Sequence, residues 1–312
     1  MTERVERSFR AMGTTMRLVV FAASAAAGER ALASAEARTR AIEARFSRFE
    51  ATSELSRINA LGGSSVVVSA EMSEVLDLAR EQHEATGGLF DPAILPDLER
   101  AGYDRTFEDI DPAADRRDAV AHGTFAELRR DGRLVLVPPG LRIDLGGIVK
   151  GWSADRVADA LGDVGPALVD LGGDIAVRGT PPGETAWTVA VEDPSGGAPL
   201  AALRIASGAV ATSGTYRRRW SGPGGAMHHL IDPRTGLPAE SDLAAVVALH
   251  PRAAVADVWA KCVLLEAPAR RAALVVSCPG LEVILVPLSG SPVGTPGALA
   301  RCVAGTVSGV AA

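Results

Sequence analysis

The sequence has few cysteines and no excess of basic residues. Its 312 residues include only Cys262, Cys278 and Cys302. An odd number of cysteines cannot form a closed disulfide framework, and no C-x-x-C or Cys/His ligand spacing occurs. We therefore expect the protein to be located in a reducing compartment. Acidic residues outnumber basic ones by 38 to 32, which gives a net charge of −6. This balance argues against broad nucleic-acid binding.

No uninterrupted apolar run is suited to a membrane helix. Residues 283–300 carry no charge, but three prolines and three glycines interrupt them, so we expect a loop-rich tail. Leu18–Ala27 has the length of a signal peptide, yet Glu3 and Glu6 precede it and no lipidation cysteine follows. We interpret this stretch as a strand and the start of a helix, and predict a cytoplasmic protein without a membrane span.

The pattern of helices and strands predicts an α+β fold. Hydrophobic residues make up 47% of the chain, enough for a large core, and we expect residues 1–312 to form one unit of two intimately packed lobes. A helix over 29–49 should bury Ile42, Phe46 and Phe49, and a second should begin after the N-cap Ser69. Asp131-Gly132 predicts a hairpin turn with positive φ at both central residues. Further strands are predicted at 16–21, 66–68, 167–171, 174–177, 187–191, 200–205, 243–249 and 281–286, helices at 152–161 and 254–265, and an exposed connection at 112–118.

Two glycine clusters could bring backbone amides close to a ligand. Residues 143–151, Ile-Asp-Leu-Gly-Gly-Ile-Val-Lys-Gly, lead from a strand into a helix, where amides and Lys150 could bind phosphate. A tight turn with a solvated lysine would look the same, and the segment is neither a Walker loop nor a dinucleotide fingerprint. Residues 170–174 place two carboxylates around Gly172-Gly173, which a hairpin turn explains equally well.

Two further clusters carry candidate proton-transfer and anion-binding groups. Residues 211–219 mix hydroxyls with three arginines, which could form an anion clamp or a solvated edge. Residues 228–236 contain two of the five histidines, and Asp232 follows His229 by three residues. Histidine accepts protons near neutral pH and a nearby carboxylate can fix its tautomer, so this is a general-base candidate. A structural turn is the alternative.

The helix predicted at 254–265 has one strongly apolar face. Asp257 and Lys261 share another face at i, i+4 spacing. On the residues alone, these two form an ordinary surface ion pair.

Taken in order, the segments resemble the ApbE family of FAD:protein FMN transferases. The resemblance spans nearly the whole chain, and several motifs in one fixed order are more specific than any single motif. It rests on residues 11–14 (Ala-Met-Gly-Thr), 46–49 (Phe-Ser-Arg-Phe), 53–59 (Ser-Glu-Leu-Ser-Arg-Ile-Asn), 86–92 (Thr-Gly-Gly-Leu-Phe-Asp-Pro), the four clusters above and 256–257 (Ala-Asp).

The resemblance implies a two-lobed α+β architecture related to the T-fold, with FAD in a cleft between the lobes. It also implies a reaction in which the FMN half of FAD moves to a threonine hydroxyl of an acceptor flavoprotein, with release of AMP. Breaking a pyrophosphate requires charge neutralisation on its oxygens and a base for the incoming hydroxyl.

The family's site residues carry over to named positions of this chain. His229 matches the essential histidine, with Asp232 and Asp257 as further catalytic candidates. A magnesium site would use the carbonyl of Gly147, the carboxylate of Asp257 and a hydroxyl where this chain has Lys261, so magnesium binding is in question. The flavin contacts fall on Met12, Phe49, Leu89, Phe90, Asp91, Asp144, Lys150, Leu230 and Ile231.

Two other positions depart from the family pattern. Phe49 replaces a common tyrosine and keeps a stacking face, whereas Thr215 replaces an aspartate. The functional alternatives are an FAD pyrophosphatase that makes FMN and AMP, and a non-catalytic FAD-binding carrier or regulator with a degenerate metal site.

Overall fold

The computed structural model describes residues 2–110, 123–222, 225–305 and 307–309. The connection expected at 112–118 lies outside these residues. The chain divides into two compact units, each built from separate segments. Unit 1 comprises residues 1–42, 150–214 and 241–312, and unit 2 comprises residues 43–149 and 215–240. Among the helices of the described residues, none combines the length and apolarity that a bilayer span needs.

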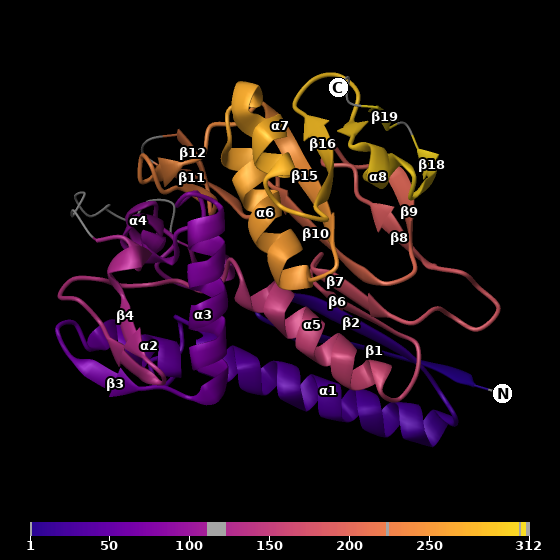
Figure 1. The fold of residues 1–312 in the computed structure, drawn as a ribbon, viewed down its shortest axis with the longest axis horizontal. Coiled ribbons are helices and arrows are strands. Elements are labelled where there is room, and N and C mark those ends of the chain that lie inside the picture. Colours follow the sequence, from indigo (N-terminus) through magenta and orange to yellow (C-terminus); the bar gives the residue numbers. More distant parts are fainter. Residues whose placement is uncertain (1, 111–122, 223–224, 306, 310–312) are drawn as a thin grey trace. The chain divides into compact units, whose positions relative to one another are not determined.

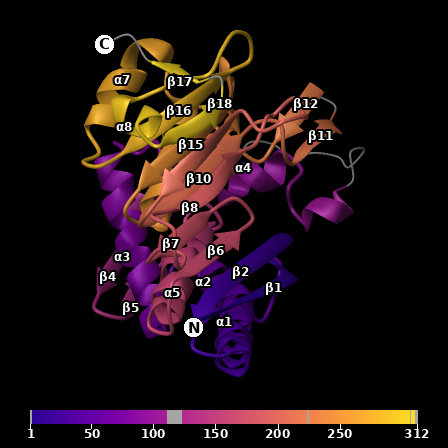
Figure 2. The same ribbon diagram turned by 90° about the vertical axis from the view of Figure 1, so that its right-hand side faces the viewer.

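Unit 1 is built on a nine-stranded sheet whose neighbouring strands are antiparallel, except for the last pair (Figures 1 and 2). Figure 2 shows β10, β15 and β16 side by side in this sheet. In spatial order its strands are β1 (Glu3–Ala11), β2 (Thr14–Ala22), β6 (Ala167–Leu171), β7 (Ile175–Arg178), β10 (Gly208–Gly214), β15 (Leu243–His250), β16 (Glu282–Pro287), β17 (Val293–Gly294) and β19 (Ser308–Gly309). A smaller sheet has the order β18 (Cys302–Gly305), β9 (Ala201–Ile205) and β8 (Trp187–Val191).

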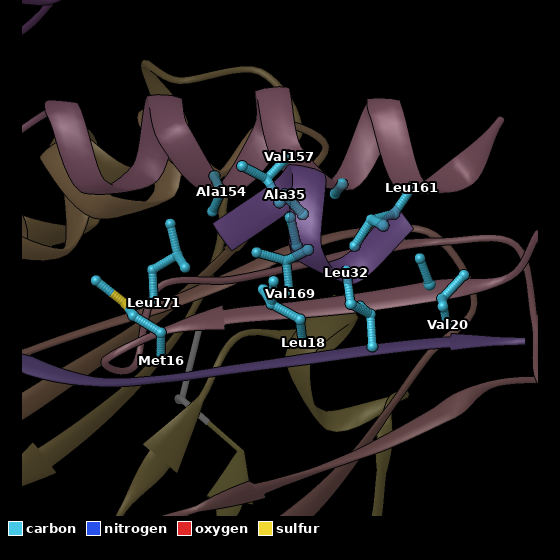
Figure 3. Close-up of a cluster of buried hydrophobic side chains, with 14 of the residues drawn as sticks. Met16, Leu18, Val20, Leu32, Ala35, Ala154, Val157, Leu161, Val169 and Leu171 are labelled. Atoms are coloured by element: carbon cyan, nitrogen blue, oxygen red, sulfur yellow. The ribbon is translucent and has the colours of Figure 1, made fainter. Parts of the chain in front are cut away.

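Helices cover one face of the large sheet. Met16, Leu18 and Val20 alternate along β2, are fully buried, and pack with residues of α1 (Ala25–Phe46) and α5 (Val149–Gly162), as Figure 3 shows. Helix α6 (Ala253–Leu265) contacts β10 and β15. On the other face of β2, the ring of Phe21 lies 5.8 Å from Trp187 of β8. The remaining helices of the unit are α7 (Pro268–Val276) and α8 (Pro296–Leu299).

Unit 2 contains a small sheet, short strand pairs and mostly short helices. One sheet has the order β3 (Ser65–Val67), β5 (Leu134–Leu136) and β4 (Arg129–Asp131), and two strand pairs are β11 (Arg219–Gly222) with β12 (Gly225–His228) and β13 (Ile231–Asp232) with β14 (Leu237–Pro238). The helices are α2 (Glu54–Ala60), α3 (Ala70–Ala85), α4 (Leu95–Arg100) and the 3₁₀ turns η1 (Pro92–Ile94), η2 (Phe107–Asp109) and η3 (Phe125–Glu127). One core cluster of this unit contains Leu98, Ala101, Tyr103, Trp220 and Ile231.

The predicted α+β class is confirmed, and most predicted elements occur within a few residues of their expected bounds. Ser69 caps α3, because its hydroxyl accepts a hydrogen bond from the amide of Met72 at 3.1 Å. The helix predicted over 29–49 instead ends at Phe46, so Phe49 lies beyond it and is 39% exposed.

Two other expectations were wrong in detail. Asp131 pairs with Leu134, so the hairpin turn consists of Gly132 and Arg133, and only Gly132 has positive φ. The turn lies one residue later in the chain than predicted, so glycine occupies its first central position instead of its second. The tail at 283–300 is also less irregular than predicted, since β16, β17 and α8 lie within it.

Candidate functional site

Lys150 and Asp174 form an ion pair at one end of the large sheet in unit 1. The ammonium of Lys150, near the start of α5, contacts Oδ2 of Asp174. Asp174 follows the tight turn Gly172–Gly173 between β6 and β7, and is 1% exposed. Burial and the nearby charge of Asp257 raise the pKa of Asp174 to about 6, although Lys150 and Lys261 oppose that rise. Lys150 is therefore held in place rather than solvated.

A second ion pair lies on α6. The ammonium of Lys261 contacts Oδ1 of Asp257 and donates to the main-chain oxygen of Asp257 at 2.8 Å. Asp257 is 3% exposed, and its Oδ2 is buried and has no hydrogen-bond partner among the residues that the structure describes. Because Asp257 contributes to the pKa of Asp174, the two carboxylates and two ammoniums form one electrostatic group, the Lys–Asp cluster of residues 150, 174, 257 and 261.

The donor atoms of the Lys–Asp cluster do not fit a divalent cation. Magnesium requires close to six oxygen ligands in near-octahedral geometry. Here the ammonium of Lys261 occupies two oxygens of Asp257. Across the described residues, no group of three or more His, Cys, Asp or Glu side chains could hold a metal ion. Gly147 belongs to unit 2, and its carbonyl stays a predicted ligand.

Helices α5 and α6, which carry the two lysines of the cluster, contact each other at the N-terminus of α6. Asp155 of α5 accepts hydrogen bonds from the amides of Ala253 and Ala254 at 2.9 and 3.1 Å, and so caps α6 from outside its own sequence. A Cβ atom on Gly151 would lie 2.5 Å from the oxygen of Ala253, so only glycine permits this approach.

Met12 lies at the turn between β1 and β2. Met12 and Gly13 have φ values of +49° and +68°, the pattern of a type I′ hairpin turn. Methionine rarely adopts this left-handed conformation, so the turn is strained. A Cβ on Gly172 would lie 2.4 Å from the side chain of Thr14, which places this turn against the one that precedes Asp174. Unit 1 thus brings together Met12 and the Lys–Asp cluster.

In unit 2 Arg48 contacts both Asp144 and Phe49, two residues predicted to contact the flavin. Its Nε donates to Oδ2 of Asp144 at 2.8 Å, and its guanidinium carbon lies 4.2 Å from the centroid of the Phe49 ring and 4.6 Å from that of Tyr103. The Arg48 side chain is only 6% exposed, whereas Phe49 is 39% exposed. These contacts combine an ion pair with cation–π stacking.

The loop that carries Asp144 is fixed by its neighbours. Oδ1 of Asp144 accepts from the amide of Gly146 at 2.8 Å, and its own amide donates to Pro92 at 2.8 Å. Asn59 holds the preceding residue, because its side chain exchanges two hydrogen bonds of 2.9 and 2.8 Å with the main chain of Ile143. The motif at 53–59 thus supports the position of Asp144.

Leu89, Phe90 and Asp91 form an internal part of unit 2. Leu89 and Phe90 are 8% and 7% exposed. Oδ1 of Asp91 accepts from the amides of Ala93 and Phe125 at 2.8 and 3.1 Å, and Oδ2 accepts from Thr124 at 2.8 Å. The Asp91 carboxylate therefore organises this region, and its contact with flavin stays a prediction.

The two adjacent histidines differ in their surroundings. Nε2 of His228 donates to the oxygen of Ala239 at 3.0 Å, and Nδ1 accepts from the amide of Leu230 at 3.3 Å, which requires a neutral ring. Burial lowers the pKa of His228 below its usual value, and the charge of Arg219 lowers it further, against the effect of the bond to Ala239. His228 is structural, whereas His229 is only half-buried.

The residues after the histidines also have defined positions. Leu230 and Ile231 are 5% and 3% exposed, so their side chains belong to the interior of unit 2. Asp232 accepts hydrogen bonds from the amide, Nε and Nη2 of Arg234 at 2.9, 2.9 and 2.7 Å. These bonds close the turn that follows β13, and the role of Asp232 beside His229 stays a prediction.

Sequence reasoning missed Arg48 and Asp174 as site residues. Both lie within recognised motifs, but no periodicity reveals that Arg48 is buried or that Asp174 binds Lys150. The available signals were a basic residue between two aromatics, in Phe46-Ser47-Arg48-Phe49, and an acid directly after a diglycine.

The comparisons with known proteins agree with this fold. Residues 12–285 match the model of the ApbE family. A relative from Treponema pallidum named "FAD:protein FMN transferase" is 32% identical over 75% of this chain and 70% of its own length. The crystal structure of the ApbE protein from Thermotoga maritima aligns with a TM-score of 0.87 and 26% identity, over 96% of this chain and 99% of that chain. The flavin transferase ApbE from Vibrio cholerae shares the fold, with a TM-score of 0.80 and 23% identity over 96% of this chain and 100% of that one. The chain therefore belongs to the ApbE family.

Proposed function

We propose that this protein is an FAD:protein FMN transferase. It moves the FMN half of FAD to a threonine hydroxyl of an acceptor flavoprotein and releases AMP. The Lys–Asp cluster carries the proposal, because it holds two ammonium groups on rigid helices beside buried carboxylates. The name of the relative from Treponema pallidum supports transfer of FMN from FAD to a protein.

In the proposed mechanism the ammoniums of Lys150 and Lys261 neutralise the pyrophosphate. Each is held by a buried carboxylate, so little reorganisation is needed when phosphate oxygens approach. The threonine oxygen attacks the phosphorus of the FMN half, the P–O bond to AMP breaks, and AMP leaves with the electron pair. A lysine supplies one positive charge as a compact point charge with three donors.

His229 accepts the proton of the threonine hydroxyl in this mechanism. Since both ring nitrogens of His228 are bound to main-chain groups, His229 is the histidine left for proton transfer. Met12 and Phe49 contact the flavin. The acceptor and its threonine, and a cytoplasmic location, are parts of the same proposal.

Intact-mass analysis of a candidate acceptor, incubated with enzyme and FAD, tests the function. Transfer adds the mass of FMN less water to the acceptor and releases AMP. His229→Ala should lower the rate by about 10²–10⁴ while FAD still binds. FMN and AMP in solution with an unmodified acceptor would show an FAD pyrophosphatase instead. Binding of FAD without either product would show a carrier.

A further inference from the structure

We infer that Arg48 is a positioning residue for the flavin ring system, which fixes Phe49 and Asp144 together and supplies a hydrogen-bond donor to the bound ring. The inference rests on the proposed function, because it takes FAD as the ligand. It extends that function by giving a role to a residue that does not take part in phosphoryl transfer.

The first support is the geometry of the guanidinium group. One edge of Arg48 is bonded to Asp144 through Nε, while its face lies against the rings of Phe49 and Tyr103. Phe49 follows the end of α1 and belongs to no helix or strand, so its own backbone does little to fix the ring. The cation therefore sets the orientation of a ring that is 39% exposed and available for stacking.

The second support is a buried donor without an acceptor. Nη2 of Arg48 is buried and makes no hydrogen bond within the described residues. A buried charged group with an unsatisfied donor is costly, and such groups in native structures call for an explanation. An acceptor oxygen or nitrogen of the flavin ring, held against Phe49, would satisfy this donor.

A planar guanidinium is needed for this combination of contacts. Lysine can form an ion pair with Asp144, but its ammonium has neither a flat face for two rings nor a second donor in a fixed direction. Arg48→Lys should therefore retain the fold and lose part of the flavin affinity. Arg48→Met should lose most of it.

The test measures binding of FMN and AMP separately, by calorimetry. Arg48→Met should weaken FMN binding roughly tenfold or more, since it removes a charged hydrogen bond and the cation–π contacts. AMP affinity should be unchanged. The absorbance spectrum of bound FMN should also change, and KM for FAD should rise more than kcat falls.

Arg130→Met is the matched control. Arg130 is another largely buried arginine of unit 2, and its Nε has no hydrogen-bond partner in the described part of the chain, but its guanidinium binds Asp77 and Ser73. This variant should leave FMN binding unchanged. Equal FMN affinities in Arg48→Met and Arg130→Met, or an equal loss of AMP binding in Arg48→Met, would overturn the inference.

The variant Arg48→Met/Asp144→Asn is a control for misfolding. Arg48→Met alone leaves the Asp144 carboxylate without its cation, whereas the double variant removes both charges of the ion pair. If the residues act as one unit, this double variant loses less FMN affinity than the sum of the losses in Arg48→Met and Asp144→Asn. Losses that simply add would contradict the link. A wild-type protein that binds no FAD overturns the proposed function and this inference together, whereas wild-type transfer with normal FMN binding by Arg48→Met overturns only the inference.

Discussion

Lys261 lies one helical turn after Asp257 on α6, and its ammonium contacts both Oδ1 and the main-chain oxygen of that residue. A positive charge thus occupies one oxygen of the carboxylate that the family resemblance would assign to a magnesium site. The two residues are an internal ion pair and not the surface pair that their i, i+4 spacing suggests, because Asp257 is 3% exposed.

Lys261→Thr should make the enzyme dependent on magnesium. Without the ammonium, the rate in EDTA should fall about tenfold or more, which corresponds to roughly 1.4 kcal/mol of transition-state stabilisation. Added magnesium should restore the rate, because Asp257 regains free oxygens. Transfer assays with and without EDTA measure both effects. A wild-type enzyme that loses nearly all activity in EDTA and regains it with magnesium would contradict the assigned role of Lys261.

Lys150→Ala should destabilise unit 1 as well as weaken FAD binding. It leaves Asp174 buried without its cation, and breaking a buried pair costs about 3–5 kcal/mol. Thermal unfolding should show a larger loss at pH 8 than at pH 5, because a pKa of about 6 leaves Asp174 mostly neutral at the lower pH. Lys150→Ala/Asp174→Asn should recover most of the stability but not the FAD affinity. An unchanged melting temperature in Lys150→Ala would show that the pair is not needed.

His228 should make the stability of the protein depend on pH. Its pKa in the folded state lies below that of the unfolded chain, so its stabilising effect is complete above the unfolded value of about 6.5. That effect is lost as the pH falls from there through the folded value. Urea unfolding between pH 8 and pH 5 measures this. His228→Gln keeps a donor for Ala239 and does not titrate, so its stability should change less over the range.

His229→Gln is the control for that experiment. It should keep the wild-type pH dependence of stability while lowering transfer. If His228→Gln instead abolishes transfer in a stably folded protein, the roles of the two histidines are reversed.

Met12→Gly should separate stability from ligand binding. Relief of the left-handed backbone, worth about 1–2 kcal/mol, offsets the lost packing of a partly buried side chain, so the free energy of unfolding should change little. FAD affinity should fall, because the proposed flavin contact is removed. Calorimetry and chemical denaturation measure the two quantities. Gly13→Ala is the opposite control: it keeps Met12 but strains the turn, and should lower stability first.

Much of the fold follows from local patterns in the sequence. The alternation of Met16, Leu18 and Val20 and the capping residue Ser69 each specify an element through contacts near in the chain. The end of α1 was placed too late because Phe49 continues the apolar spacing of Ile42 and Phe46. Its ring is held instead by Arg48 and Tyr103, and the Tyr103 contact is not visible in a helical pattern.

The candidate site was only partly predictable for a similar reason. The resemblance supplied Lys150, Asp257 and Asp144 as single positions, each identified by a local motif. Their partners depend on which distant segments the fold brings together, such as Asp174 beside Lys150. Burial also depends on the fold, so the sequence could not distinguish the structural His228 from the more accessible His229.

The cap that Asp155 provides for α6 has a consequence for protein engineering. Because the first amides of α6 are satisfied by a residue of α5, and Gly151 allows the two helix starts to touch, the helices form a single module. Transplanting the lysines of this site into another scaffold would therefore require both helices and their shared junction. A graft of α6 alone would begin with two unsatisfied amides and no fixed direction for Lys261.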